Sequence, residues 1–220
     1  TPAPDIIHEA AGHAPIIANP DFSQYLKNYA KVANKSILNK SDIDLYEAIR
    51  ELSDLKEHPG TTDKEKIKSE EKLKHISENM GRPSEAAVLG RMNWWTAEYG
   101  LIGDKDEPKI FGAGILSSIG ESENCLKDEV KKLPLTVDCI NYSYDITEQQ
   151  PQLFLTPSFE HLSHVLNELS EMMAYKQGGY ISVDKAIGAQ TVNTVQLNTG
   201  LQISGVVEKQ IVKSDKTIFI

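Results

Sequence analysis

Two histidines near the start of the sequence, His8 and His13, are of the residue type that binds metal ions and lie close together. They are five positions apart, so on a regular α-helix their side chains would point about 140° away from each other. In the zinc-protease motif the spacing is four positions, and the angle is only about 40°. His8 and His13 therefore bind one ion only where the backbone departs from a regular helix, and we expect Gly12 to provide that freedom.

A metal site needs a third ligand, and the candidate is Glu98. It lies in an otherwise apolar helical stretch that contains Trp94 and Trp95, where a carboxylate is costly to bury unless it is paired or bound to a metal. Two histidines and one carboxylate leave coordination positions open, as in the facial triad of non-haem Fe(II) oxygenases. The spacing alone also permits a simpler interpretation, with hydrogen-bonded core histidines and Glu98 on the surface.

Two other functions stay open at this point. His8 and His13 with Glu9 as general base would form a zinc-dependent hydrolase, although the five-residue spacing weighs against it. A non-catalytic chain that serves assembly through residues 34–86 or 177–220 is the other alternative.

Four sequence blocks, in one order, resemble the pterin-dependent aromatic amino acid hydroxylases. They are TPAPDIIHEAAGHAP at 1–15, WWTAEYGL at 94–101, FGAGILSSIGE at 111–121 and YDITEQQP at 144–151. The resemblance covers residues 1–38 and about 87–175, and within the family it looks closest to phenylalanine 4-hydroxylases. It implies a helix-rich, irregular catalytic core of the type found in this family.

The resemblance also implies roles for individual residues. His8, His13 and Glu98 would bind Fe(II), and Glu9 would act in catalysis as a polar anchor on the side of a bound tetrahydropterin. Ser117 would hydrogen-bond the second ring nitrogen of His8 and fix the orientation of that ring. The residues implied to border the substrate are Thr1, Pro2, Trp94, Gly114, Ser117 and Ile146.

The implied reaction is a monooxygenation of an aromatic amino acid by O₂, with Fe(II) and tetrahydropterin as cofactors. The family position that corresponds to Ile146 is acidic in tyrosine-preferring enzymes, and an apolar residue cannot satisfy a buried phenol hydroxyl. Ile146 and Trp94 together favour the conversion of phenylalanine to tyrosine, a step of phenylalanine catabolism. Asn93 and Tyr99 depart from the family's usual Tyr and Phe.

The start of the chain bears on activity. The family's preceding part of the catalytic domain carries most of the pterin-stacking loop and the arginine that clamps the substrate carboxylate, and it has no counterpart before Thr1. Iron binding without turnover is therefore one expected behaviour of this chain.

Composition limits the partners. The 220 residues carry a net charge of −9 with a pI of about 5.2, which disfavours binding to nucleic acid. No apolar run approaches the roughly 20 residues of a membrane span, and no signal peptide is visible. We expect a cytoplasmic protein whose partners are an aromatic amino acid and O₂, with no nucleic acid and no membrane partner. Homo-oligomerisation stays open.

The elements that must position these residues are mainly α-helical, with small β elements. Apolar periodicity predicts helices that begin near Pro20, Ser41 and Pro157 and a core helix over residues 85–101. Charge pairs four residues apart predict a solvated helix over residues 63–78. A strand-like stretch is expected within residues 109–120, and two short strands within residues 133–144. Residues 1–176 form the predicted iron-binding part of a catalytic domain, and the charged stretch 34–86 forms a helical hairpin inserted in it. Beyond Gly179 the period changes to two, which predicts a β-rich tail over residues 177–220.

Overall fold

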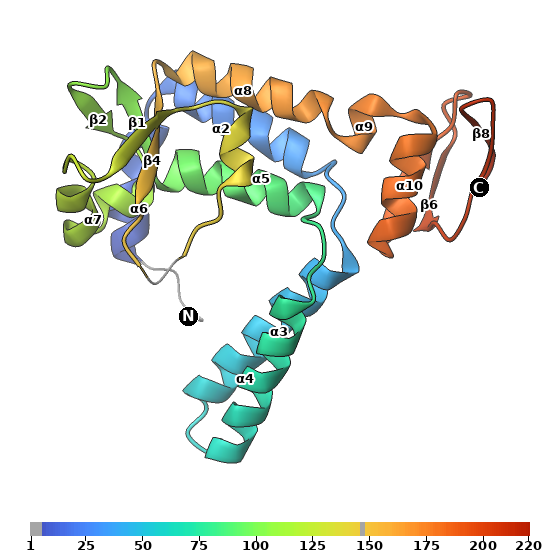
Figure 1. The fold of residues 1–220 in the computed structure, drawn as a ribbon, viewed down its shortest axis with the longest axis horizontal. Helices are drawn as coiled ribbons and strands as arrows, with labels where there is room; N and C mark the ends of the chain where they lie inside the picture. The colour runs from blue at the N-terminus through green and yellow to red at the C-terminus, as the bar shows by residue number, and fades with distance from the viewer. Residues whose placement is uncertain (1–5, 146–147) are drawn as a thin grey trace. The chain divides into compact units, whose positions relative to one another are not determined.

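The computed structural model describes residues 6–145 and 148–220 (Figure 1). The chain divides into two compact units. The first unit contains the residues up to Lys35 together with Val88–Met172, and the second contains Ser36–Ala87 together with Met173–Ile220. The inserted segment and the C-terminal segment thus belong to one unit, a grouping that the sequence pattern did not indicate. The predicted boundary near residue 177 stays a prediction.

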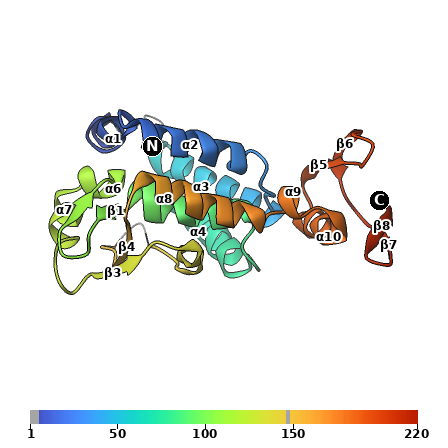
Figure 2. The ribbon, with the colours of Figure 1, turned by 90° about the horizontal axis from the view of Figure 1, so that it is seen from above.

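The helices of the first unit include those that carry predicted site residues. They are η1 (His8–His13), α1 (Ala14–Ile17), α2 (Pro20–Ala33), the greater part of α5 (Glu85–Asn93), η2 (Trp94–Glu98), α6 (Ala113–Leu116), α7 (Ile119–Asn124), η3 (Val137–Asn141) and α8 (Phe159–Glu171). The Asn19 side chain caps α2 by accepting from the backbone N–H groups of Asp21 and Phe22. Helices α2 and α8 pack side by side (Figure 2), so the amphipathic faces predicted for both bury each other.

A four-stranded sheet completes this unit. It consists of β1 (Gly100–Gly103), β2 (Pro108–Ile110), β3 (Lys131–Pro134) and β4 (Gln152–Thr156), in the order β2-β1-β4-β3. Strand β4 is parallel to both of its neighbours, whereas β2 is antiparallel to β1. The buried cluster beside the sheet comprises Leu101, Ile115, Cys125, Val130 and Leu153.

Two predictions in this unit need correction. The helix expected over residues 85–101 is α-helical only up to Asn93. The π-helix η2 follows it, because the Tyr99 N–H bonds the Trp94 carbonyl, five residues earlier, at 2.8 Å. The second strand expected within residues 133–144 is wrong. The Thr136 side chain accepts from the Asp138 N–H and starts the 3₁₀ helix η3 there.

The second unit begins with a helical hairpin, as predicted for the inserted segment. Helices α3 (Lys40–Glu57) and α4 (Asp63–Glu78) run antiparallel to each other (Figure 1), and capping boxes at Asn39 and Thr62 fix where each begins. Ion pairs join the two helices, with Lys72 Nζ 2.6 Å from Glu51 Oε2 and Lys56 Nζ 3.0 Å from Glu70 Oε1.

The base of the hairpin is held by the Glu85 carboxylate, which is largely buried. It accepts hydrogen bonds from the Ile37 N–H at 3.1 Å, the Ala174 N–H at 2.8 Å and Lys185 Nζ at 3.1 Å. These bonds tie both ends of the inserted segment to α9 (Ala174–Gln177) and α10 (Gly179–Ala189). The small apolar core of this unit is Ile37, Ala174, Val183, Ala186, Ala189 and Val207.

The tail is less β-rich than predicted, because residues 179–189 form helix α10 and not a strand. Gly178 and Gly179 have φ angles of 61° and 68°, which permit the sharp entry into this helix. The strands that follow are β5 (Val192–Gln196), β6 (Gln202–Val206), β7 (Ile211–Lys213) and β8 (Lys216–Phe219). They form two separate antiparallel hairpins (Figure 2), with turns at residues 198–200 and 214–215.

No helix in the described ranges combines the length and apolarity that a bilayer crossing requires.

Candidate metal centre

The three side chains predicted to bind a metal ion converge in the first unit. His8 Nε2 lies 3.1 Å from His13 Nε2 and 3.4 Å from Glu98 Oε2, and His13 Nε2 lies 3.4 Å from Glu98 Oε1. Two ring nitrogens and one carboxylate at this spacing can serve as the ligands of one shared ion, with ligand atoms about 2 Å from it. Over residues 6–145 and 148–220, they form the one group of three or more His, Cys, Asp or Glu with all ligand atoms within 4.8 Å of one another.

The two imidazoles meet because η1 is a π-helix. The Ala14 N–H bonds the Glu9 carbonyl, five residues earlier, instead of the α-helical four. A turn closed over five residues returns His13 to the side of the helix that carries His8. The departure from regular helix that the five-residue spacing demands is therefore present, and the two rings meet edge to face with centroids 4.8 Å apart.

Gly12 has a different role from the one predicted. It is buried, and its backbone is helical, so the expected need for extra conformational freedom is wrong. A Cβ atom at Gly12 would lie 2.7 Å from the Ala113 carbonyl oxygen and 2.9 Å from the Ala113 Cβ. Glycine is required here because η1 and α6 approach each other too closely for a side chain.

Glu98 is positioned by an equally close approach. A Cβ at Gly112 would lie 2.5 Å from both the Glu98 carbonyl oxygen and the Gly100 nitrogen. The small residues of the Gly112–Gly114 segment thus let α6 pack against both π-helices. As a result, the element that carries Glu98 and the element that carries the histidines share one support.

Ser117 contacts the first histidine in a way that fixes its tautomer. The Ser117 Oγ–H donates to the Ala113 carbonyl at 2.7 Å, which uses the single hydroxyl proton. Ser117 Oγ also lies 2.8 Å from His8 Nδ1, so the Nδ1–H of His8 must be the donor in that bond. His8 Nε2 is then left with its lone pair directed toward Glu98 and His13, which is the form that a metal ligand needs.

We expect Ser117→Ala to weaken metal affinity by about 10- to 100-fold, because nothing would then hold the His8 tautomer. The adjacent Ser118→Ala is the matched control. The Ser118 side chain caps α7 by accepting from the Glu121 N–H, so its loss should lower stability by about 1 kcal/mol without changing affinity. Fe(II) titration and urea unfolding of both variants check this. Equal loss of affinity in the two variants would contradict the tautomer argument.

The predicted substrate residues fall into two groups. Trp94, Gly114 and Ser117 are described, and Trp94 stacks on Tyr99 and on Tyr144 with ring centroids 4.6 Å and 4.2 Å away. A Cβ at Gly114 would lie 2.7 Å from the Tyr99 ring. The other three, Thr1, Pro2 and Ile146, lie outside the described residues.

Glu9 lies on η1 with an exposed side chain. Glu9 thus shares the π-helical turn of His8 and His13. Its predicted contact with the pterin and its predicted catalytic role stay predictions.

Sequence reasoning missed a buried carboxylate at Glu121. Its side chain is 7% exposed, Oε1 accepts from the Gln150 N–H at 3.3 Å, and Oε2 has no hydrogen-bond partner within the described ranges. Burial raises the pKa of Glu121. Burial also raises the pKa of Tyr99, with smaller contributions from the charges of Glu121 and Glu98. In the sequence Glu121 sits in a polar run, so nothing indicated that it is buried.

Glu121→Gln should stabilise the folded chain at neutral pH. A carboxyl with a raised folded-state pKa favours the folded state most when it is protonated, and that contribution is lost as the pH rises through the folded pKa. Glutamine cannot ionise, so the stability advantage of the variant over the parent should be absent below the ordinary carboxyl pKa of about 4.3 and should grow as the pH rises above it. Urea unfolding at several pH values measures it. A constant stability difference across this range would count against a buried, ionising Glu121.

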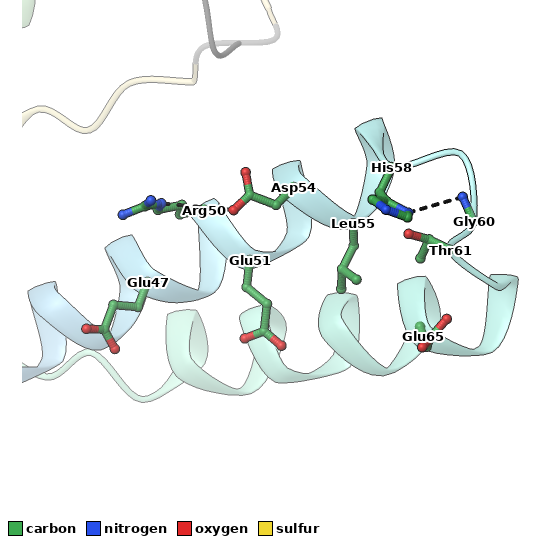
Figure 3. A pocket seen from close by; sticks show the side chains of 9 residues that line it. All are labelled: Glu47, Arg50, Glu51, Asp54, Leu55, His58, Gly60, Thr61 and Glu65. Carbon is green, nitrogen blue, oxygen red and sulfur yellow. Dashed lines mark hydrogen bonds and ion pairs between the residues drawn. The ribbon is translucent and has the colours of Figure 1, made fainter.

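An open groove on the hairpin of the second unit is a separate feature (Figure 3). Its lining comes from α3, the connection after it and the first turn of α4, and comprises Glu47, Arg50, Glu51, Asp54, Leu55, His58, Gly60, Thr61 and Glu65. His58 Nδ1 already accepts from the Gly60 N–H at 3.1 Å. The groove includes none of the predicted site residues.

Comparison with known protein families places the chain. Residues 78–202, more than half of the sequence, match the family described as biopterin-dependent aromatic amino acid hydroxylase. The chain belongs to this family. The matched range contains Glu98, Trp94, Gly114 and Ser117 and begins after the two histidines.

Two of the relatives are named phenylalanine-4-hydroxylase. The chain is 28% identical to that of Dictyostelium discoideum over 172 residues, covering 78% of this chain and 29% of the relative. It is 30% identical to that of Rattus norvegicus over 163 residues, covering 72% of this chain and 25% of the relative. The chain therefore spans less than a third of the length of either relative.

A solved structure in the same family is also similar to this chain. Phenylalanine hydroxylase of Chromobacterium violaceum, with bound iron(III) and oxidised 7,8-dihydrobiopterin, matches with a TM-score of 0.48 and 24% identity. The match covers 77% of this chain and 46% of that one.

Proposed function

We propose that this chain forms the iron-binding part of an Fe(II)- and tetrahydropterin-dependent monooxygenase that hydroxylates an aromatic amino acid. The observation that carries the proposal is the convergence of His8 Nε2 and His13 Nε2, 3.1 Å apart, on the Glu98 carboxylate, whose two oxygens each lie 3.4 Å from one of these nitrogens. Family membership supports the pterin and the substrate class, and favours this function over a zinc-dependent hydrolase.

The residues present fit an iron ion. Two neutral nitrogen ligands and one anionic oxygen ligand are the donor set of non-haem Fe(II) oxygenases. The side chains of His8, His13 and Glu98 remain 27%, 21% and 20% exposed, so the same centre is open to small molecules on one side. When bound, iron and tetrahydropterin together supply the reduction of O₂ and the oxidation of the aromatic ring.

The chain's own residues then bind and orient. Ser117 holds the His8 ring with Nε2 toward the ion, and the Ala113 carbonyl holds the Ser117 proton. Glu98 contributes the negative charge that balances part of the ion's charge. Glu9, next to His8 on η1, serves as the polar contact on the pterin side.

The substrate preference is proposed to be phenylalanine. The aromatic rings of Trp94, Tyr99 and Tyr144 form a stacked wall that suits an aromatic side chain. Ile146 offers no partner for a phenol hydroxyl, which disfavours tyrosine as the substrate. The named relatives are phenylalanine-4-hydroxylases, which supports the same choice.

Anaerobic titration of the chain with Fe(II) tests the metal centre, and we expect one equivalent to bind. Incubation of the loaded chain with phenylalanine, O₂ and tetrahydropterin tests the reaction. Any tyrosine formed should require both cofactors. Absence of Fe(II) binding, or tyrosine formation that persists without either cofactor, would contradict the proposal.

A further inference from the structure

A buried hydrogen-bonded chain links helix α2 to the π-helix that carries Glu98. The Tyr25 hydroxyl lies 3.0 Å from Thr96 Oγ1, and Thr96 Oγ1 lies 2.7 Å from the Met92 carbonyl oxygen. Tyr25 and Thr96 are both fully buried. This contact is a direct polar link between the two elements.

The direction of each hydrogen bond follows from the protons available. A carbonyl oxygen cannot donate, so the Thr96 hydroxyl donates its single proton to the Met92 carbonyl. Thr96 Oγ1 must therefore accept, and the Tyr25 hydroxyl is the donor. Burial raises the pKa of Tyr25 far above its ordinary value, so this hydroxyl keeps its proton and can donate at neutral pH.

The bond to Met92 fixes the Thr96 hydroxyl against the backbone. Thr96 lies inside η2, two residues before Glu98, and its hydroxyl donates to the carbonyl four residues earlier, in α5. The Tyr25 hydroxyl therefore bonds an oxygen whose position is set by the backbone of η2 and of the α5 turn that leads into it.

We propose that Tyr25 is a positioning residue for Glu98, acting through Thr96 to hold η2 in the π-helical form that turns the carboxylate toward His8 and His13. Tyr25 touches neither the ion site nor the histidines; it sets where the third ligand stands. This inference rests on the proposed function, because the consequence it predicts is measured as metal affinity.

Tyr25→Phe tests the inference by removing one hydroxyl. The matched control is Tyr29→Phe, on the same helix, whose hydroxyl donates to the Leu89 carbonyl of α5 at 2.9 Å. We expect Tyr25→Phe to weaken Fe(II) binding by about tenfold, the lower end for residues that act through a ligand's support. Tyr29→Phe should change affinity by less than about twofold, because the bond it loses ends on α5 and not on η2.

Amide hydrogen exchange at Tyr99 gives a readout that does not depend on the metal. The Tyr99 N–H closes the π-turn on the Trp94 carbonyl, so it should exchange faster in Tyr25→Phe than in Tyr29→Phe. Thr96→Val should lower Fe(II) affinity and speed Tyr99 exchange as Tyr25→Phe does. The double variant should lose no more affinity than Thr96→Val alone, since both residues act through the same hydrogen bond. Thr96→Ser keeps the hydroxyl and should keep the affinity.

The outcomes separate this inference from the proposed function. If the parent chain binds no Fe(II), the proposed function fails, and Tyr99 exchange alone decides the role of Tyr25. If the parent binds Fe(II), unchanged affinity in Tyr25→Phe overturns the inference even where exchange is faster. Equal effects of Tyr25→Phe and Tyr29→Phe on both readouts overturn it in either case.

Discussion

Glu98→Ala is expected to weaken Fe(II) binding by more than about 100-fold. Substitutions that only disturb a ligand's support cost about 10- to 100-fold, and this one removes a ligand atom together with its negative charge. The remaining pair, His8 and His13, would hold the ion through two neutral nitrogens. Stability should change little, because without metal the carboxylate is only partly buried.

The measurement is an anaerobic competition titration against a chromophoric Fe(II) chelator. Glu123→Ala is the matched control, since it removes an exposed carboxylate of α7 in the same unit. It changes net charge equally and should leave the affinity unchanged. Equal Fe(II) binding by Glu98→Ala and the parent would show that Glu98 is not a ligand and would contradict the facial-triad assignment.

Gly12→Ala is expected to destabilise the chain by about 1–3 kcal/mol, the usual cost of overpacking, and to weaken Fe(II) binding at the same time. The new Cβ would meet backbone atoms of Ala113 at 2.7 Å and 3.0 Å, and backbone cannot swing aside as a flexible side chain can. Helix η1 must move away from α6. His8 would then separate from Ser117, and the hydrogen bond that fixes the His8 tautomer would be lost.

Gly90→Ala is the matched control, because it makes the same substitution where there is space for a side chain. Gly90 lies in α5, and a Cβ there would meet nothing within 4 Å. The same change should stabilise this helix by about 0.5–1 kcal/mol through propensity alone. Urea unfolding should therefore give opposite signs for the two variants. Two shifts of the same sign would show that η1 and α6 do not depend on the glycine contact.

Local signals in the sequence account for the elements that it predicted well. Helix α4 was predicted as Asp63–Glu78 and is observed with those bounds. Its start is set by Thr62 and Glu65, which form a capping box within four consecutive residues. Because the determinants of α4 lie inside α4, the sequence of that segment is sufficient to place it.

Helix α10 shows where local reading fails. Ile181 and Val183 alternate with polar residues as in a strand, yet the buried residues of this segment, Val183, Ala186 and Ala189, are three apart. Their burial comes from contacts with Ile37 and Val207, which are distant in sequence. Tertiary packing selected the helix, and no pattern within the segment reveals such partners.

The turns that carry His8, His13 and Glu98 were predicted only in part, unlike α4 and α10. The spacing of His8 and His13 demanded a departure from regular helix, and the chemistry of Glu98 suggested a third ligand. The sequence does not encode, in any local pattern, the π-turn that ends at Glu98 or the bond from Tyr25 that supports it. Both depend on where α2 and α6 lie against η2, which is a property of the folded unit.

The π-turn at His8–His13 also accommodates one residue more than an α-helical turn. Deleting Gly12 would leave His-Glu-Ala-Ala-His, whose four-residue spacing brings two imidazoles together on an ordinary α-helix. Because the wide turn and its extra residue would disappear together, His13 and the helix after it would keep nearly the same rotational phase. The position against Ala113, however, would be taken by a residue that carries a Cβ atom. The extra residue therefore lets one turn bring the two histidines together and also pack closely on α6.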